Sequence, residues 1–126
     1  MKAIVIDDSR TIRMMIKKFL TGQGFETLYE AGDGREALEK LKEIGPVDLA
    51  MVDWNMPVMD GLDFVKNVRQ DRQYNGMRMM MVTTESQPAQ VEAAMAAGVN
   101  EFITKPFTND VLRIKLDAMG FERKSA

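Results

Sequence analysis

Hydrophobic residues fall along the chain in two alternating kinds of run, and the first kind is short and unbroken. Runs of about strand length cover Ala3 to Ile6, Leu49 to Val52 and Met79 to Val82. Continuous apolar segments of this length are typical of strands buried on both faces of a sheet. Weaker patterns at Thr27 to Ala31 and at Glu101 to Thr104 predict two further strands.

The second kind of run repeats at steps of three and four residues, which is the spacing of one face of a helix. Gly, Pro or Asn residues bound each of these segments, as Gly22 and Gly24 do for the first. The five stripes are Ile12, Met15, Ile16, Phe19 and Leu20; Ala37, Leu38 and Leu41; Phe64, Val65 and Val68; Val91, Ala94 and Met95; and Leu112, Leu116 and Met119.

Strands and helices that alternate in this way predict a parallel sheet covered on both faces, because each connection must return the chain to the same edge with a right-handed crossover. The fold class is therefore α/β, a three-layer doubly wound sheet of five strand-helix units, (βα)5. No linker or internal repeat interrupts the pattern, and 126 residues suffice for one compact core. We expect residues 1–126 to form a single domain.

The amino-acid composition excludes several kinds of functional site. The chain has no cysteine and no histidine, which excludes disulfides, thiolate metal sites, a histidine base and a phosphohistidine. A net charge of -2 supplies no basic field, so binding to nucleic acid is not expected. The apolar start ends at Asp7-Asp8 and is too short for a signal or membrane segment, so we expect a cytoplasmic protein.

Polar side chains follow four of the predicted strands, at the point where each strand ends. Asp7 and Asp8 follow the first strand, Asp53 the third, Thr83 the fourth and Lys105 the fifth. The carboxyl ends of parallel strands meet at one edge of the sheet, where doubly wound folds bind their ligands. The sequence therefore predicts that these five side chains converge on one site.

Three crowded carboxylates repel one another, so a cation is their natural partner. Mg²⁺ fits best, because it prefers oxygen ligands and commonly joins carboxylates to a phosphate. A carboxylate beside such an ion can attack phosphorus and form an acyl phosphate, and Asp53 is best placed to do so. The Lys105 ammonium and the Thr83 hydroxyl can contact phosphoryl oxygens.

Each feature also has an ordinary structural interpretation. An acidic pair at a strand end is often a turn or a helix cap, and Ser9 can cap the first helix. The methionines of Met79 to Met81 are interpreted as core residues rather than a sulfur site. The segment from Gly32 to Gly34 is interpreted as a turn, because it lacks the rest of a phosphate-loop pattern. Only the convergence of the strand-end residues favours a functional site.

At these residues the chain resembles the receiver domains of bacterial response regulators. The resemblance spans nearly the whole chain and includes Asp7-Asp8, the segment from Asp53 to Gly61, Thr83, and Lys105-Pro106-Phe107. It implies a flavodoxin-like sheet with the strand order 2-1-3-4-5, which the hydrophobic pattern alone does not distinguish from other doubly wound orders.

The resemblance also implies a role for each site residue. Mg²⁺ is bound by the side chains of Asp8 and Asp53 and by the carbonyl of Asn55, with Asp7 acting through water. Asp53 accepts the phosphoryl group from a histidine kinase, and Thr83 and Lys105 contact it. The Lys105-Pro106 peptide bond is typically cis in this family, which proline permits.

Within the family, single-domain chemotaxis receivers are the most similar, because Trp54, Asn55, Met56 and Glu85 match their pattern. We therefore expect a monomer that controls a protein partner such as a flagellar motor switch, with no effector domain. Two residues depart from the pattern. Phe102 replaces a tyrosine whose ring moves inward on activation, and Thr84 replaces a smaller residue. In this interpretation Thr83 moves toward the phosphoryl group, Phe102 turns inward, and the face of the fourth helix and fifth strand changes.

Three alternatives remain at this stage. A phosphorelay carrier or phosphate sink would use the same chemistry and pass the group to a histidine phosphotransfer protein. A Mg²⁺-dependent phosphohydrolase of the haloacid dehalogenase type is disfavoured by Asn55, because that class has a second Asp at this position. A degenerate receiver that is never phosphorylated is disfavoured by the intact five-residue set. We therefore expect a signalling domain that catalyses only its own phosphorylation and dephosphorylation.

Overall fold

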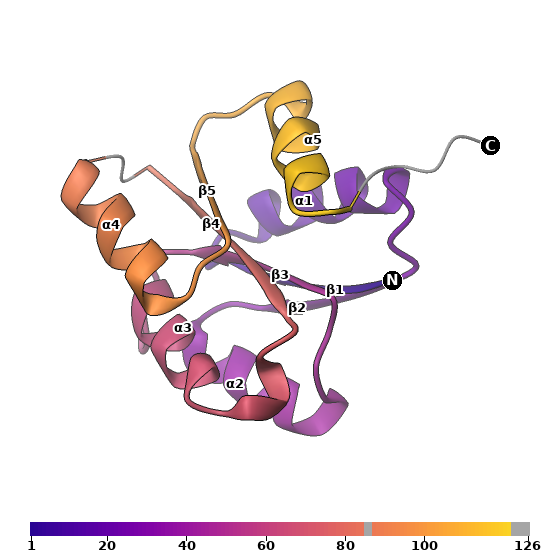
Figure 1. Cartoon of the computed structure of the whole chain (residues 1–126). Helices are drawn as coiled ribbons and strands as arrows, with labels where there is room; N and C mark the ends of the chain where they lie inside the picture. Colours follow the sequence, from indigo (N-terminus) through magenta and orange to yellow (C-terminus); the bar gives the residue numbers. More distant parts are fainter. Residues whose placement is uncertain (85–86, 122–126) are drawn as a thin grey trace.

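The computed structural model describes residues 1–84 and 87–121, in which strands and helices alternate (Figure 1). The strands are β1 Lys2–Ile6, β2 Thr27–Ala31, β3 Leu49–Asp53, β4 Arg78–Thr83 and β5 Glu101–Thr104. The helices are α1 Arg10–Gly22, α2 Gly34–Ile44, α3 Gly61–Arg69, α4 Pro88–Ala97 and α5 Asn109–Ala118, with a short 3-10 turn, η1, at Arg72–Tyr74. All five predicted strands and all five predicted helices are present.

The five strands form one parallel sheet in the order β2-β1-β3-β4-β5, which confirms the predicted fold class and strand order. The register aligns the carboxyl ends of the strands. Ile6 of β1 lies opposite Ala31 of β2 and Val52 of β3, and Thr83 of β4 lies opposite Thr104 of β5. The residues that follow β1 and β3 therefore leave the sheet side by side.

Helices cover both faces of the sheet, giving three layers. Helices α1 and α5 lie on one face, and α2, α3 and α4 lie on the other (Figure 1). Because successive strand residues point to opposite faces, β1 supplies Ile4 and Ile6 to one core and Ala3 and Val5 to the other. The apolar residues of β1, β3 and β4 are buried from solvent on both faces of the sheet, as their unbroken apolar sequences predict.

Short polar side chains start most of the helices. The side chains of Ser9, Asp33, Asp60 and Thr108 each accept a hydrogen bond from the backbone N–H three residues later. The cap at Ser9 and the turn at Gly32 to Gly34 are as predicted. Among the described residues, no helix is both long and apolar enough to cross a membrane.

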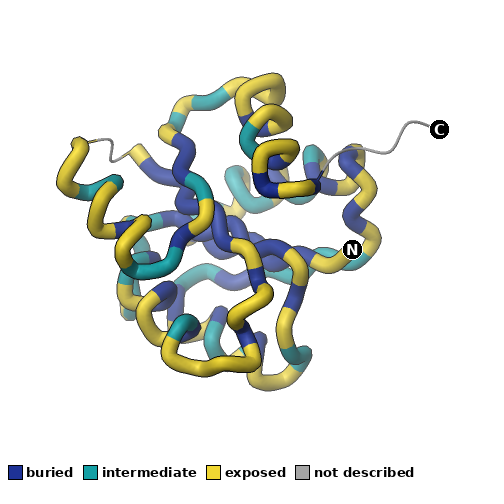
Figure 2. The backbone as a smooth tube through the Cα atoms, in the orientation of Figure 1, coloured by how far each residue is buried: buried dark blue, intermediate teal, exposed yellow. Residues whose placement is uncertain are grey.

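Burial agrees with most of the hydrophobic pattern, because the strands at the centre of the molecule are buried and exposed residues lie mainly on the helices and loops around them (Figure 2). The exposed fractions differ from the pattern at two methionines. Met79, Met80 and Met81 are fully buried, as predicted. Met15 and Met95 belong to the predicted helical stripes, yet they are 60% and 45% exposed. Met15 lies at the edge of its stripe, above a groove. Met95 lies on α4, whose sequence is rich in alanine and has no distinct apolar and polar faces, so periodicity cannot mark its buried face.

Candidate functional site

Three carboxylates meet where β1 and β3 end. Asp7 and Asp8 directly follow β1, and Asp53 is the last residue of the adjacent β3. One oxygen from each lies within 4.8 Å of the others. Asp7 and Asp53 are buried, whereas Asp8 is exposed. The predicted acidic cluster is therefore present and opens to solvent on the Asp8 side.

Lys105 brings a positive charge into this cluster from the end of β5. Its Nζ lies 2.8 Å from Oδ2 of Asp7 and 3.7 Å from Oδ1 of Asp53. The Lys105-Pro106 peptide bond is cis, as the family resemblance implies, and the backbone N–H of Lys105 donates to the carbonyl of Thr83 at 2.8 Å. One ammonium group thus lies close to two of the three carboxylates, and the cluster retains excess negative charge.

The electrostatics single out Asp53. Burial and the nearby charge of Asp7 raise the pKa of Asp53 to about 6, against an opposing effect of Lys105. Asp8 raises the pKa further, and a backbone hydrogen bond from Trp54 lowers it. A carboxylate whose charge is disfavoured in this way is stabilised by any added cation.

Thr83 completes the predicted set at the end of β4. It is fully buried, and its neighbour Thr84 is exposed. The strand order places β4 next to β3, so Thr83 lies one strand away from Asp53 on the side of Lys105. Glu85, which matches the pattern of single-domain chemotaxis receivers in the sequence, lies outside the described residues.

The loop after Asp53 is held closely against the strand end. The N–H of Gly61 donates to the carbonyl of Trp54 at 2.8 Å, and a side chain at Gly61 would overlap the Asp53 carbonyl oxygen. Asn55 is exposed on this loop, near its start. Val58 has a φ of 69°, a left-handed conformation that is rare for a β-branched residue. The close contact at Gly61 was not anticipated from the sequence.

Phe102 already lies inward in this structure. Its side chain is expected to turn inward on activation, but the residue is already only 9% exposed and packs in the core beneath α3 and α4. A phenylalanine has no hydroxyl that needs water or a partner, so burial of this ring has no polar cost. In this structure the ring already occupies the inward position, and its movement on activation stays a prediction.

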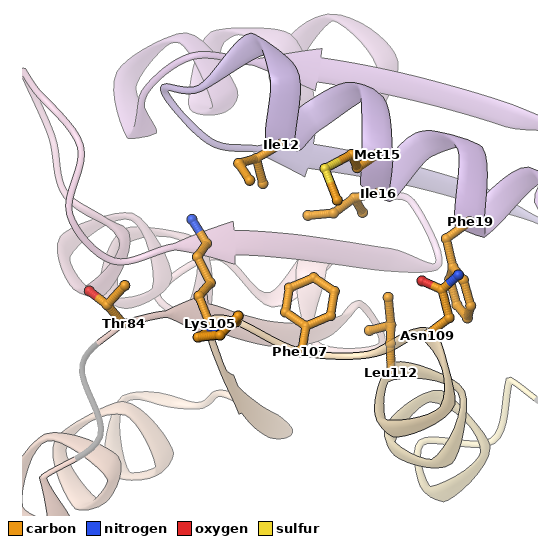
Figure 3. A pocket seen from close by; sticks show the side chains of 10 residues that line it. Ile12, Met15, Ile16, Phe19, Thr84, Lys105, Phe107, Asn109 and Leu112 are labelled. Carbon is orange, nitrogen blue, oxygen red and sulfur yellow. The ribbon is translucent and has the colours of Figure 1, made fainter.

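A hydrophobic cavity of about 330 Å³ adjoins Lys105, between α1 and the β5–α5 connection (Figure 3). Phe107 and Leu112 face Met15 and Ile16 across it. The acidic cluster is not part of its lining. This position explains why Met15 stays exposed although it belongs to an apolar stripe.

Sequence reasoning missed two residues that support Asp7. The guanidinium of Arg13 donates to the backbone carbonyl of Asp7 at 2.5 Å and also to Glu30 of β2 at 2.9 Å. No local pattern marks either residue, because the contact depends on β2 lying beside β1. The strand-end rule identifies only side chains that directly follow a strand.

The donor set fits a hard divalent cation. The cluster offers carboxylate oxygens from Asp7, Asp8 and Asp53, and the chain contains no histidine or cysteine to favour a softer metal. The raised pKa of Asp53 reflects negative charge that a single lysine does not offset.

Comparison with known proteins adds independent information. Residues 3–117 match the model of the response regulator receiver domain. Chemotaxis protein CheY1 of Helicobacter pylori is 46% identical over 119 residues, which cover 94% of this chain and 96% of that protein.

Two solved structures are also similar. Chemotaxis response regulator CheY4 of Vibrio cholerae has a TM-score of 0.85 at 38% identity, covering 93% of this chain and 96% of that one. A CheX-CheY-BeF3-Mg complex from Borrelia burgdorferi has a TM-score of 0.86 at 25% identity, covering 94% and 88% of the two chains.

Proposed function

This chain belongs to the response regulator receiver domain family, and from that premise we propose that residues 1–126 form one CheY-like receiver whose phosphoacceptor is Asp53. The chain is a phosphorylation-activated chemotaxis signalling switch. The observation that supports the residue assignment is the convergence of Asp7, Asp8 and Asp53 with Lys105 at the carboxyl edge of the sheet.

Mg²⁺ is the proposed metal. The side chains of Asp8 and Asp53 and the carbonyl of Asn55 would hold it, with Asp7 acting through water. When bound, the ion offsets the carboxylate charge and the charge of an incoming phosphoryl group. The Borrelia relative is described as a complex with Mg and BeF3, which supports this choice of metal.

In the proposed reaction, a carboxylate oxygen of Asp53 attacks the phosphorus of a phosphohistidine on a histidine kinase. The new O–P bond forms an acyl phosphate, the P–N bond breaks, and its electron pair returns to the imidazole nitrogen. Lys105 exchanges its contact with Asp7 for a phosphoryl oxygen. The hydroxyl of Thr83 donates to a second oxygen and moves the end of β4 toward Asp53.

The output surface is proposed to be the face formed by α4, β5 and α5. Thr83 ends β4, and α4 is the next helix in the chain. Exposed apolar side chains lie on this face at Met95, Val111 and Ile114. Because Phe102 is already buried, movement of the end of β4 and of α4 is proposed to carry the signal, and Thr84 limits that movement by its bulk.

The test uses Trp54, the only tryptophan, which directly follows Asp53. Mg²⁺ should change its fluorescence, and acetyl phosphate should then cause a second change together with the mass increase of one phosphoryl group. Asp53→Asn should lose the second change and the mass increase while keeping the fold.

Asp63→Asn is the matched control. It makes the same charge change at an exposed position in the first turn of α3 and should respond like the wild type. A mass increase that persists in Asp53→Asn would refute the assignment of the phosphoacceptor.

The partners are proposed to be a histidine kinase and a downstream protein of the flagellar motor switch. A phosphorelay role predicts instead that phosphorylated protein transfers its group to a histidine phosphotransfer protein. Incubation with each candidate, followed by mass analysis of both proteins, separates the two. Repeated turnover of ordinary phosphate esters would favour the phosphohydrolase.

A further inference from the structure

Every polar backbone and carboxylate group of Asp7 has a defined partner. Its N–H donates to the carbonyl of Ala31 at 3.1 Å, and its carboxylate accepts from the N–H of Ser9 at 2.9 Å and from Lys105 at 2.8 Å. The carbonyl oxygen remains, and it accepts from Nη1 of Arg13 at 2.5 Å. Arg13 is thus the only side chain among the described residues that holds the peptide between Asp7 and Asp8.

Arg13 is itself held in place by β2. Its Nε donates to Oε1 of Glu30 at 2.9 Å, and the other oxygen of Glu30 accepts from Lys17 at 2.9 Å. The side chain of Arg13 is only 17% exposed. Lys17 and then Arg13 keep the pKa of Glu30 below its usual value, so Glu30 remains charged at neutral pH. The rigid guanidinium therefore bridges a carboxylate on β2 and a carbonyl after β1.

We propose that Arg13, supported by Glu30, is a positioning residue for the acidic pair and increases the affinity of the cluster for Mg²⁺. This inference rests on the proposed metal site. The carbonyl of Asp7 lies in the same peptide plane as the N–H of Asp8, so fixing this plane fixes the direction in which Asp8 leaves the backbone. Asp8 is exposed, and its side chain has no hydrogen-bond or ion-pair partner in the described part of the chain. The orientation of its backbone therefore decides where its carboxylate lies. Groups that orient metal ligands typically change affinity by about 10- to 100-fold.

The direction in which Mg²⁺ affinity changes when Arg13 is removed distinguishes a positioning role from a purely electrostatic one. Arg13 is a cation close to a cation site, so if it acted only through its charge, its removal would strengthen Mg²⁺ binding. If it positions the acidic pair, its removal weakens binding. Arg10 is a suitable control because it is an exposed arginine on the same helix and forms no hydrogen bond or ion pair with Asp7 or Glu30 among the described residues.

The experiment is a Mg²⁺ titration of the full chain, followed by Trp54 fluorescence and repeated by calorimetry. Arg13→Gln should raise the Kd about tenfold, whereas Arg10→Gln should leave it unchanged or lower it. Arg13→Lys keeps the charge but lacks the fork that reaches both partners, so it should restore only part of the affinity. Urea unfolding of each variant verifies that the fold is intact.

Glu30→Gln tests the same inference without touching Arg13. It weakens the support of the guanidinium, but it also removes a negative charge, which by itself weakens the binding of a cation. Glu36→Gln is therefore its charge control, because Glu36 is exposed on the neighbouring turn and forms no ion pair with Arg13 among the described residues. If Arg13→Gln does not fold, a Kd that is raised about threefold more in Glu30→Gln than in Glu36→Gln decides the question. A Kd for folded Arg13→Gln or Glu30→Gln equal to or below the wild-type value would overturn the positioning role alone. A wild-type protein that does not bind Mg²⁺ would overturn the proposed metal site and this inference with it.

Discussion

Lys105 and Asp7 form an ion pair of 2.8 Å that joins the ends of the last and the first strand of the chain. The pair is mostly withdrawn from water, because the side chains are 18% and 2% exposed. The same ammonium lies 3.7 Å from Asp53. Lys105 therefore neutralises part of the acidic cluster before any phosphoryl group arrives and must exchange partners when one does.

Replacement of Lys105 should separate metal binding from the response to a phosphoryl group. Lys105→Met removes a competing cation, so we expect Mg²⁺ binding to tighten about fivefold, which corresponds to about 1 kcal/mol of repulsion at close range. The Trp54 response to beryllofluoride should weaken at the same time, because one contact to the phosphoryl mimic is lost. Both are measured by fluorescence titration.

Lys115→Met is the control for that variant. Lys115 lies on α5 and pairs with Glu101 at 3.2 Å. The variant Lys115→Met therefore removes the same positive charge, but at a position outside the acidic cluster. Weaker Mg²⁺ binding in Lys105→Met would contradict the expected competition.

The pKa of Asp53 predicts how stability depends on pH without Mg²⁺. The folded chain holds this proton up to about pH 6, whereas an unfolded aspartate releases it near the reference value of 3.8. Between these values the unfolded state binds fewer protons, so the free energy of unfolding falls as pH rises. Asp53→Asn lacks this titration.

Wild type and Asp53→Asn should therefore have similar stability near pH 4, and the variant should be more stable by about 2 kcal/mol near pH 7. Urea unfolding at both pH values, in buffer containing a chelator, measures the difference. Added Mg²⁺ should reduce it, because the ion binds the ionised wild-type site. A variant that is less stable than wild type at neutral pH would contradict this account of Asp53.

Gly61 should tolerate no side chain. A Cβ there would overlap the carbonyl oxygen of Asp53, and both groups belong to backbone that is fixed by a strand and a helix. We expect Gly61→Ala to lower the free energy of unfolding by about 3 kcal/mol. Gly22→Ala is the control, because no atom lies within 4 Å of the added Cβ, and urea unfolding of both variants checks the contrast.

Val58 stores backbone strain in the loop after Asp53. Its φ of 69° disfavours a β-branched side chain, and the residue is 76% exposed, so the side chain contributes little packing. Val58→Asn should raise the free energy of unfolding by about 1 kcal/mol, since asparagine tolerates this conformation. Val58→Ala removes methyl groups without offering the local hydrogen bonds of asparagine and should gain less. Equal stability of Val58→Asn and wild type in urea would show that the strain is negligible.

Several parts of the site were predictable because they depend on short stretches of chain. Asp53 and Lys105 each directly follow a predicted strand, and a parallel sheet brings such ends together. Ser9 caps α1 through a hydrogen bond to a residue three positions later, which is a local rule. The role of Arg13 was not predictable, because its partners come from β2 and from the turn after β1.

The hydrophobic pattern by itself determined the number and kind of elements, because runs of continuous apolar residues and runs with helical spacing are properties of neighbouring residues. It also placed the acidic, hydroxyl and ammonium groups at strand ends. The tertiary structure alone decided which oxygens lie within 4.8 Å, that Lys105 contacts Asp7 more closely than Asp53, and that Met15 stays exposed. These features depend on distances between residues far apart in the chain, and such distances are set only when the sheet and both helical layers pack together.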